Sequence, residues 1–393
     1  MLPDAGLYKI QDSRVRKKIF IVTTVPETFT SILKGQPRSL NEHYNVEIVT
    51  SPDEGARAID EGVKVHRVPM VRGINVFRDM ISVMKMVALL YKESPFAVHS
   101  YTPKAGLVSM LAAWICRVPV RVHTFTGLIF PTQTGFKKAL LIGIDRLICA
   151  CATRIVPEGE GVKNDLIKAG ITKKALSVIG HGNVAGVDVS YFDPDLLEVK
   201  QTSVSLFEQL NIPANSFVFC FVGRLNKDKG LKELAISFSQ MPDSTRLVIV
   251  GDTDTSAPVD TASMMLLESN CRVHMLGFQG DIRPALSCAD VLVLPSYREG
   301  FPNVVLQAGA MKLPALVTDI SGCNEIIQPD INGWLVPPRQ HHDLTAAMLR
   351  IMTLPPETRV QMGVNARKRV TSRFDRKDHL ARMVQFYKEA LDV

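Results

Sequence analysis

Short runs of apolar and β-branched residues alternate with longer amphipathic stretches along most of this chain. In the first half, the runs predict strands over residues 19–23, 46–50, 63–68, 97–100, 120–124, 154–156 and 176–179. Stretches with helical spacing lie between them, at residues 74–92, 104–116, 137–151 and 160–169. Nearly continuous apolar strands separated by helices are typical of a parallel sheet that helices cover on both faces.

The alternation pauses over residues 187–210 and then starts again. Strands are predicted at residues 217–222, 247–250, 273–276, 291–294, 315–318 and 334–336, with helices at 231–240, 282–288, 303–311, 343–353 and 356–373. We therefore expect an N-terminal Rossmann-like domain over 1–192 and a C-terminal one over 193–375. The last helix, within 376–393, is expected to pack back on the first domain. Two doubly wound sheets of this kind would face each other across a ligand-binding cleft.

Composition is that of an ordinary globular protein, because 46% of the 393 residues are hydrophobic and 22% are charged. Seven cysteines without a Cys-x-x-Cys pair favour a reduced, cytoplasmic compartment. The longest apolar run, residues 139–151, is interrupted by Asp145 and Arg146, and the N-terminus has no apolar signal segment. We expect a cytoplasmic protein, free in solution or peripheral at the inner face of the membrane.

A formal net charge of +7 favours anionic ligands or an anionic membrane surface and does not by itself indicate nucleic acid, which we do not expect as a partner. Several basic residues in the first half could contact anionic lipid, and ordinary solvated charge explains them equally well. They are Arg14, Arg16, Lys17, Lys18, Lys137, Lys138, Lys173 and Lys174.

Two segments follow predicted strands of the second half, where ligands of open α/β sheets bind. In the first, Gly223 allows a close backbone turn, and Arg224 and Lys229 supply two cations suited to a diphosphate. In the second, Glu299 precedes a helix for which Asn303 is the expected N-cap, and Gln307 lies one turn later on the same face. The positive end of that helix would face an anion. The alternatives are a solvated charged loop and surface residues.

These motifs resemble family 4 retaining glycosyltransferases of the GT-B fold. The resemblance rests on Gly223-Arg224-Leu225 with Lys229-Gly230, on the segment from Ser296 to Leu306, on residues 319–325 and on residues 332–337, in their usual order. It extends from Ile19 to the C-terminus and is nearest to bacterial enzymes that build capsule, exopolysaccharide or O-antigen units of lipopolysaccharide.

The resemblance implies roles for individual residues. Arg224 and Lys229 would bind the diphosphate of a nucleotide-sugar donor, and Glu299 would contact hydroxyls of the transferred sugar. The donor-binding segment would also comprise Gly223, Gly300, Phe301, Pro302, Asn303, Val304 and Gln307, with the amides from Gly300 to Val304 cradling sugar and phosphate. Gln307 would contact the ribose. It departs from the family pattern, which has a second glutamate there, so the donor's affinity is in question.

In the first half, the resemblance places His123 near the donor sugar, so that the catalytic set is His123, Glu299, Arg224 and Lys229. Alternatively, His123 is a core histidine whose hydrogen-bonding groups find their partners within the protein. Weaker matches on the acceptor side are Gly35 and Gln36, which resemble the flexible acceptor loop of the family, and His99.

No metal or other cofactor is expected, because cations and a helix end would stabilise the leaving group. Asp252-Thr253-Asp254 could be read as a metal-binding Asp-x-Asp, but a turn is the favoured reading. Cys149 and Cys151 with His341 and His342 have no familiar zinc spacing.

The expected activity is retaining transfer of a hexose-type sugar from a nucleotide diphosphate donor, in the first place a UDP-sugar. The acceptor would be a saccharide or a lipid-diphosphate-linked saccharide in cell-surface polysaccharide biosynthesis. Two alternatives stay open: a sugar-nucleotide epimerase of related shape, and a non-catalytic nucleotide-sugar-binding partner of another transferase.

Overall fold

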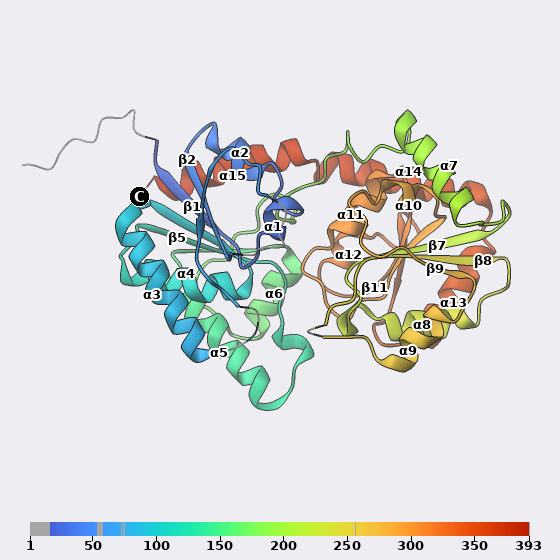
Figure 1. Ribbon diagram of the computed structural model, residues 1–393, viewed down its shortest axis with the longest axis horizontal. Helices are drawn as coiled ribbons and strands as arrows, with labels where there is room; N and C mark the ends of the chain where they lie inside the picture. The colour runs from blue at the N-terminus through green and yellow to red at the C-terminus, as the bar shows by residue number, and fades with distance from the viewer. Residues whose placement is uncertain (1–15, 53–57, 72, 74, 256, 393) are drawn as a thin grey trace, which may run out of the picture. The chain divides into compact units, whose positions relative to one another are not determined.

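The computed structural model describes residues 16–52, 58–71, 73, 75–255 and 257–392 (Figure 1). Arg14 lies outside the described residues. Two parallel sheets of six strands each form the centre of the fold, with helices between most successive strands. The α/β class and the two doubly wound sheets are confirmed. No helix among the described residues has the length and apolar character needed to cross a membrane.

The first sheet has the strand order β3-β2-β1-β4-β5-β6. Its strands are β1 (Lys18–Val22), β2 (Asn45–Thr50), β3 (Lys64–Arg67), β4 (Ala97–Tyr101), β5 (Val120–Phe125) and β6 (Arg154–Pro157). The strand predicted at residues 176–179 is absent from this described region. Leu176 makes a single bridge to Ile155, and the chain turns away at Gly180, where φ is +61°.

The longer helices described in the first half begin and end close to their predicted limits, whereas two short ones were not predicted. The helices are α1 (Glu27–Thr30), α2 (Gln36–Asn41), α3 (Val76–Glu93), α4 (Pro103–Ile115), α5 (Gly135–Cys151) and α6 (Glu160–Lys168), with a 3-10 turn at Phe130–Thr132. The pattern did not predict α1 and α2. Helices of four and six residues are too short to show a 3.6-residue period.

The second sheet has the order β12-β11-β10-β7-β8-β9. Its strands are β7 (Phe217–Val222), β8 (Thr245–Val250), β9 (Val273–Met275), β10 (Val291–Leu294), β11 (Ala315–Thr318) and β12 (Gly333–Val336). The associated helices are α7 (Leu197–Gln209), the 3-10 turn η2 (Lys227–Lys229), α8 (Leu231–Ser239), α9 (Thr261–Glu268), α10 (Arg283–Ser287), α11 (Asn303–Ala310), α12 (Cys323–Ile326), α13 (His341–Met352), α14 (Pro356–Arg373) and α15 (Arg376–Leu391). The strand order reverses between β10 and β7, so their carboxyl ends form the switch point of this sheet.

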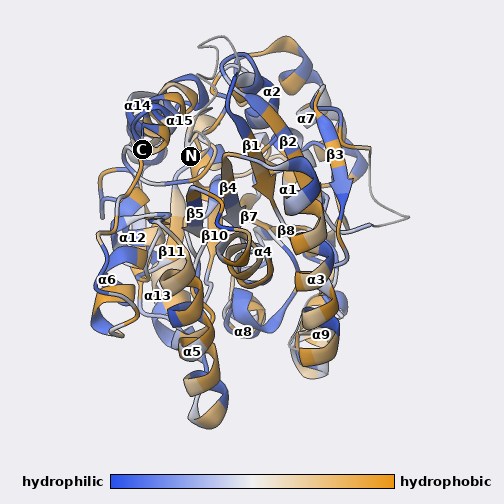
Figure 2. Cartoon of the chain, turned by 90° about the vertical axis from the view of Figure 1, so that its left-hand side faces the viewer, coloured by the Kyte–Doolittle hydropathy of each residue, from blue (hydrophilic) through white to orange (hydrophobic). Residues whose placement is uncertain are grey.

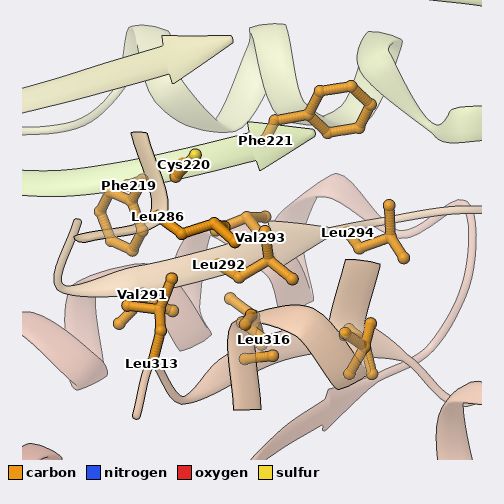
Figure 3. Packing of buried hydrophobic residues seen from close by; sticks show 14 of the residues in the cluster. Phe219, Cys220, Phe221, Leu286, Val291, Leu292, Val293, Leu294, Leu313 and Leu316 are labelled. Carbon is orange, nitrogen blue, oxygen red and sulfur yellow. The ribbon is translucent and has the colours of Figure 1, made fainter. Parts of the chain in front are cut away.

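The two strands at that switch point, β7 and β10, have a buried apolar centre. Phe219, Cys220 and Phe221 of β7 lie beside Leu292 and Val293 of β10, and all are inaccessible to solvent (Figure 3). Their side chains alternate to the two faces of the sheet, each of which helices cover. This rigid centre fixes the loops that follow β7 and β10.

By contacts, the chain divides into two compact units. The first comprises the described residues of 1–123, 151–153 and 390–393, and the second those of 124–150 and 154–389. Within the first unit, Lys17 Nζ donates to the backbone oxygen of Leu391 at 2.6 Å, which ties the end of α15 to the start of β1. The boundaries at residues 192 and 375 stay a prediction.

Candidate active site

Arg224 lies in the loop after strand β7, and an ion pair with Asp254 orients its side chain. Its Nη1 donates to Asp254 Oδ2 at 2.9 Å, while 60% of the Arg224 side chain stays exposed. Asn226 Nδ2 donates to the same oxygen at 3.4 Å. Because Asp254 is itself only 10% exposed, it fixes the stem of the guanidinium and leaves the remaining N–H groups for a ligand.

The Asp252-Thr253-Asp254 segment is occupied by contacts within the protein. Asp252 Oδ1 accepts from the backbone N–H of Phe278 at 2.9 Å, and Thr253 forms a bridge with Leu225. Thr253 thus forms an isolated β-bridge, and the preference for a turn over a metal-binding Asp-x-Asp stays a prediction. Among the described residues, the group that brings three metal-type ligands together is Glu47, His66 and Glu93. Lys18 and Lys64 already form ion pairs with its carboxylates.

Lys229 and Glu299 meet at the switch point. Lys229 Nζ lies 2.6 Å from Glu299 Oε1, and the Ser296 hydroxyl donates to the same oxygen at 2.6 Å. Ser296 is fully buried and its carbonyl accepts from Thr318 Oγ1. The pair is therefore largely shielded from water, yet its two side chains come from loops that follow different strands. The spacing in sequence predicted neither this ion pair nor the role of Ser296.

The loop after β10 is fixed against the loop after β7. At Gly230 φ is +68°, and a Cβ there would lie 1.9 Å from the carbonyl oxygen of Pro295, so only glycine fits. Tyr297 donates its hydroxyl to Glu233 at 2.5 Å, and Arg298 pairs with Asp228 at 2.8 Å. Gly251, which follows β8, is also crowded, because a Cβ there would lie 2.0 Å from the carbonyl oxygen of Gly223. A Cβ at Gly223 itself would not be crowded.

Helix α11 begins differently from our prediction. Its N-cap is Pro302, and Asn303 is the first helical residue, so the expectation that Asn303 caps the helix is wrong. The Asn303 side chain instead accepts from Asn183 Nδ2 at 2.6 Å. Within the described residues, the backbone N–H groups of Asn303 and Val304 have no hydrogen-bond partner. They are free to bind an anion.

Some of the other residues in the predicted donor segment are buried in the core, and others are accessible to solvent. Phe301 and Pro302 are buried, and the Phe301 ring packs 5.4 Å from that of Phe374. Only their backbone groups can reach a ligand. Gln307 lies one turn after Asn303 and is half-buried. It lies on the less buried side of α11 with Asn303 and Val304, so its amide is accessible.

Glu158 was not singled out from the sequence. It follows β6 and is only 5% exposed, and its Oε2 would lie 2.2 Å from a Cβ on Gly300. Burial raises the pKa of Glu158 well above its usual value, and the charges of Glu299 and Glu325 add to the effect. The protonated carboxyl is therefore favoured over the carboxylate, compared with a glutamate in water. Its place at the carboxyl end of a parallel strand was the signal that could have found it.

Glu325 belongs to the motif at residues 319–325, but the sequence did not predict a role for it. Its carboxylate accepts from the N–H groups of Glu160 and Gly161, at 2.7 and 2.9 Å, and from that of Gly322 at 3.1 Å. It thereby caps α6 from α12, which are far apart in sequence. A Cβ at Gly161 would lie 2.8 Å from Glu325 Oε1, so glycine is required for this contact.

In the first unit, both predicted histidines are buried. His123 Nδ1 lies 2.8 Å from Ser100 Oγ, and burial lowers the pKa of His123 to about 3. His99 stacks on Tyr101 with ring centroids 4.4 Å apart, and burial together with His123 lowers its pKa to about 3. Both are neutral at pH 7. Their functional roles stay predictions.

The predicted acceptor loop is ordered around Glu61. The Gly35 N–H donates to Glu61 Oε1 at 2.7 Å and the Arg38 N–H donates to Oε2 at 3.2 Å, so Glu61 caps α2. Gln36 is buried and donates to Tyr101 Oη at 3.1 Å. Contact of Gly35 and Gln36 with an acceptor remains a prediction.

Comparison with known families matches both halves of the chain. Residues 35–182 match the family described as Glycosyl transferase 4-like domain, and residues 204–369 match Glycosyl transferases group 1. The capsular polysaccharide biosynthesis glycosyltransferase CapM of Staphylococcus aureus is 31% identical over 365 residues, which cover 91% of this chain and 93% of that protein. A UDP-Gal:alpha-D-GlcNAc-diphosphoundecaprenol alpha-1,3-galactosyltransferase of Escherichia coli is 29% identical over 84% of this chain and 88% of its own.

Solved structures share the fold. Sucrose-phosphate synthase from Thermosynechococcus elongatus has a TM-score of 0.78 at 20% identity, over 95% of this chain and 99% of that one. Anabaena HepE in complex with UDP-glucose has a TM-score of 0.77 at 18% identity, again over 95% and 99%.

Proposed function

Since the chain belongs to the glycosyltransferases of the GT-B fold, we propose that it transfers a sugar from a UDP-sugar, with retention, to a lipid-diphosphate-linked saccharide. The observation that carries the proposal is the meeting of Lys229, Glu299 and the free N–H groups of α11 at one switch point. The relatives named for capsule synthesis and for transfer to diphosphoundecaprenol supply the biological setting.

The cations would act on the leaving group. As the bond between the sugar's anomeric carbon and the donor phosphate breaks, negative charge grows on the diphosphate oxygen. Arg224, with its exposed guanidinium, and Lys229 would stabilise that charge together with the N–H groups of Asn303 and Val304. Lys229 would exchange its contact with Glu299 for one with the diphosphate, which frees the carboxylate to accept hydrogen bonds from sugar hydroxyls.

Retention would follow from attack on the same face of the sugar that the diphosphate leaves. The acceptor hydroxyl oxygen would form the new bond to the anomeric carbon, and its proton would pass to the departing diphosphate oxygen. Burial raises the pKa of Glu158 and disfavours its carboxylate, which argues against Glu158 as an anionic nucleophile. The role that the family resemblance implies for His123 at the sugar is part of this proposal.

The nucleotide would be bound less tightly than in relatives with a second glutamate. Gln307 can donate to and accept from ribose hydroxyls but carries no charge. The two alternatives predict other outcomes: an epimerase would return an epimerised donor, and a non-catalytic partner would bind the donor without forming a product. No feature of the described site favours either.

The decisive experiment offers the protein a panel of UDP-sugars with a short-chain lipid-diphosphate-linked monosaccharide. We expect one donor to give an extended lipid-linked product by mass spectrometry, with an α-anomeric proton by NMR. An epimerised donor, or donor binding without turnover on any acceptor tested, would contradict the proposal.

A further inference from the structure

Helix α3 exposes an unusual amount of apolar surface for a helix of a compact unit. Its buried residues, Ser82, Met86 and Leu90, form the inner side that packs toward α4. On the opposite side, Phe77 is 77% exposed, Met84 is 56% exposed and Tyr91 is 83% exposed. These three are spaced by seven residues, which places them in one stripe along the helix. Met80 and Ile81 widen the stripe.

A basic stripe runs directly beside the apolar one. Arg78, Lys85 and Lys92 each follow a member of the apolar stripe by one residue, and all three are exposed. The acidic residues of the helix do not balance them. Asp79 is paired with Lys104, and Glu93 is paired with Lys18 and Lys64, so the charge that α3 presents to solvent is positive. Figure 2 colours the hydrophobic residues of α3 orange and its hydrophilic residues blue.

Neighbouring residues of the same unit extend both features. An apolar groove between α3 and the end of α4 is lined by Met84, Tyr91 and Ile115. A second hollow shares Tyr91 and is lined by Arg16, Lys17 and Arg117. Apolar contact area and cationic side chains therefore meet at the carboxyl end of the helix. This combination suits acyl chains on one side and phosphate headgroups on the other.

We propose that the outer face of α3 docks the protein on an anionic lipid bilayer, with Phe77, Met84 and Tyr91 in the interfacial layer. This docking proposal rests on the proposed function in one respect, because a lipid-linked acceptor would keep the enzyme's substrate in a membrane. A second copy of this chain is a poorer occupant, since its α3 offers the same exposed cations and no unpaired acid to complement them. An exposed apolar face bordered by cations is typical of helices that lie in a membrane interface.

This surface differs from the basic residues noted in the sequence. Lys17 donates to Leu391, Lys18 is paired with Glu47 and Glu93, and Lys174 donates to the carbonyls of Cys149 and Ala150. Their charges are partly engaged within the protein. The cations of α3 border an apolar stripe, which is what distinguishes a docking face from scattered solvated charge.

The test measures partition of the full chain onto vesicles of phosphatidylcholine with or without phosphatidylglycerol, free of any lipid-linked sugar. We expect binding to the anionic vesicles that weakens as salt is raised. The triple variant Phe77→Ser, Met84→Ser and Tyr91→Ser should lower the partition coefficient by about tenfold or more and leave its salt dependence unchanged. Glutamine at Arg78, Lys85 and Lys92 should lower it by about 10–100-fold at low salt and remove most of the salt dependence.

The matched control is Leu197→Ser with Val204→Ser on α7, two exposed apolar residues that are also seven apart and lie in the other unit. It should bind vesicles like the wild type. Equal binding by the Phe77, Met84 and Tyr91 variant, or no preference of the wild type for anionic vesicles, would overturn the proposal. So would a dimer of the wild type, by light scattering, that this variant abolishes.

Failure of the docking surface can be told apart from failure of the proposed activity. Both α3 variants should keep wild-type turnover on a water-soluble short-chain acceptor, because no residue of α3 belongs to the donor site. Vesicle binding without any transferase activity would reject the activity and keep the docking surface. Transferase activity without vesicle binding would keep the proposed activity and reject the docking surface.

Discussion

Removal of the Lys229 ammonium tests both the structure and the chemistry of the candidate site. Lys229 Nζ lies 2.6 Å from Glu299 Oε1, with 20% and 12% of the two side chains exposed. At an effective dielectric constant of 20, two unit charges at that separation attract by about 6 kcal/mol. Desolvation offsets much of this attraction. Between the ~1 kcal/mol of an exposed pair and the 3–5 kcal/mol lost on breaking a buried one, we expect Lys229→Met to cost about 2 kcal/mol of stability.

Such a loss should lower the melting temperature by about 4–8 °C. Most of the cost comes from leaving the Glu299 carboxylate without its cation, so Glu299→Gln in the same chain should restore much of the stability. The double-mutant cycle separates this coupling from other effects of either change. Lys232→Met is the matched control, because Lys232 is an exposed lysine on the adjoining helix. It should melt like the wild type.

Activity should respond differently from stability. Lys229→Met should lower turnover by about two to three orders of magnitude, the range for loss of one group that stabilises a developing oxyanion. The Glu299→Gln change should not restore it, since the missing contact is to the leaving diphosphate. The assay is product formation at saturating donor, below the melting temperature of every variant. Wild-type turnover in Lys229→Met would refute the leaving-group role, and zero coupling in the cycle would refute the stability argument.

Three further predictions concern other parts of the fold. Gln307→Ala should weaken donor binding by about 1–2 kcal/mol in calorimetry and leave turnover at saturating donor largely intact, because ribose contacts are alike in ground and transition states; an unchanged Kd would mean that the amide does not contact the ribose. Burial raises the pKa of Glu158 above 4.5, so the folded state binds more protons than the unfolded state, and stability falls as pH rises from about 4.5 through the raised value. Glu158→Gln should remove that fall, so the melting temperature of this variant should rise relative to that of the wild type as pH increases. A constant difference would contradict the raised pKa of Glu158. Gly106→Ala would place a methyl group 2.4 Å from His123 Cε1 and should cost about 1–3 kcal/mol in urea unfolding, whereas Gly143→Ala, where nothing lies within 4 Å, should cost nothing.

The sequence was informative where local pattern decides structure. Predicted runs coincide with all twelve strands of the two sheets, and most of these runs are apolar because a strand buried on both faces must be apolar almost throughout. The thirteenth predicted run, residues 176–179, has the same composition but makes one bridge only, since composition cannot say whether a partner edge is available. The motifs also marked Arg224, Lys229 and Glu299, because ligand-binding residues of such sheets follow the carboxyl ends of strands.

Other features of the site depend on residues that are distant in sequence. The contact of Lys229 with Glu299 requires β7 and β10 to be neighbours, and the sheet order alone decides that. The cap of Glu325 on α6, the raised pKa of Glu158 and the use of the Asn303 side chain by Asn183 likewise depend on segments that only folding brings together. A sequence pattern reports which residues a segment offers and on which face they lie. Distances, burial and the charges that surround a group are properties of the packed chain, so they were decided by the tertiary structure.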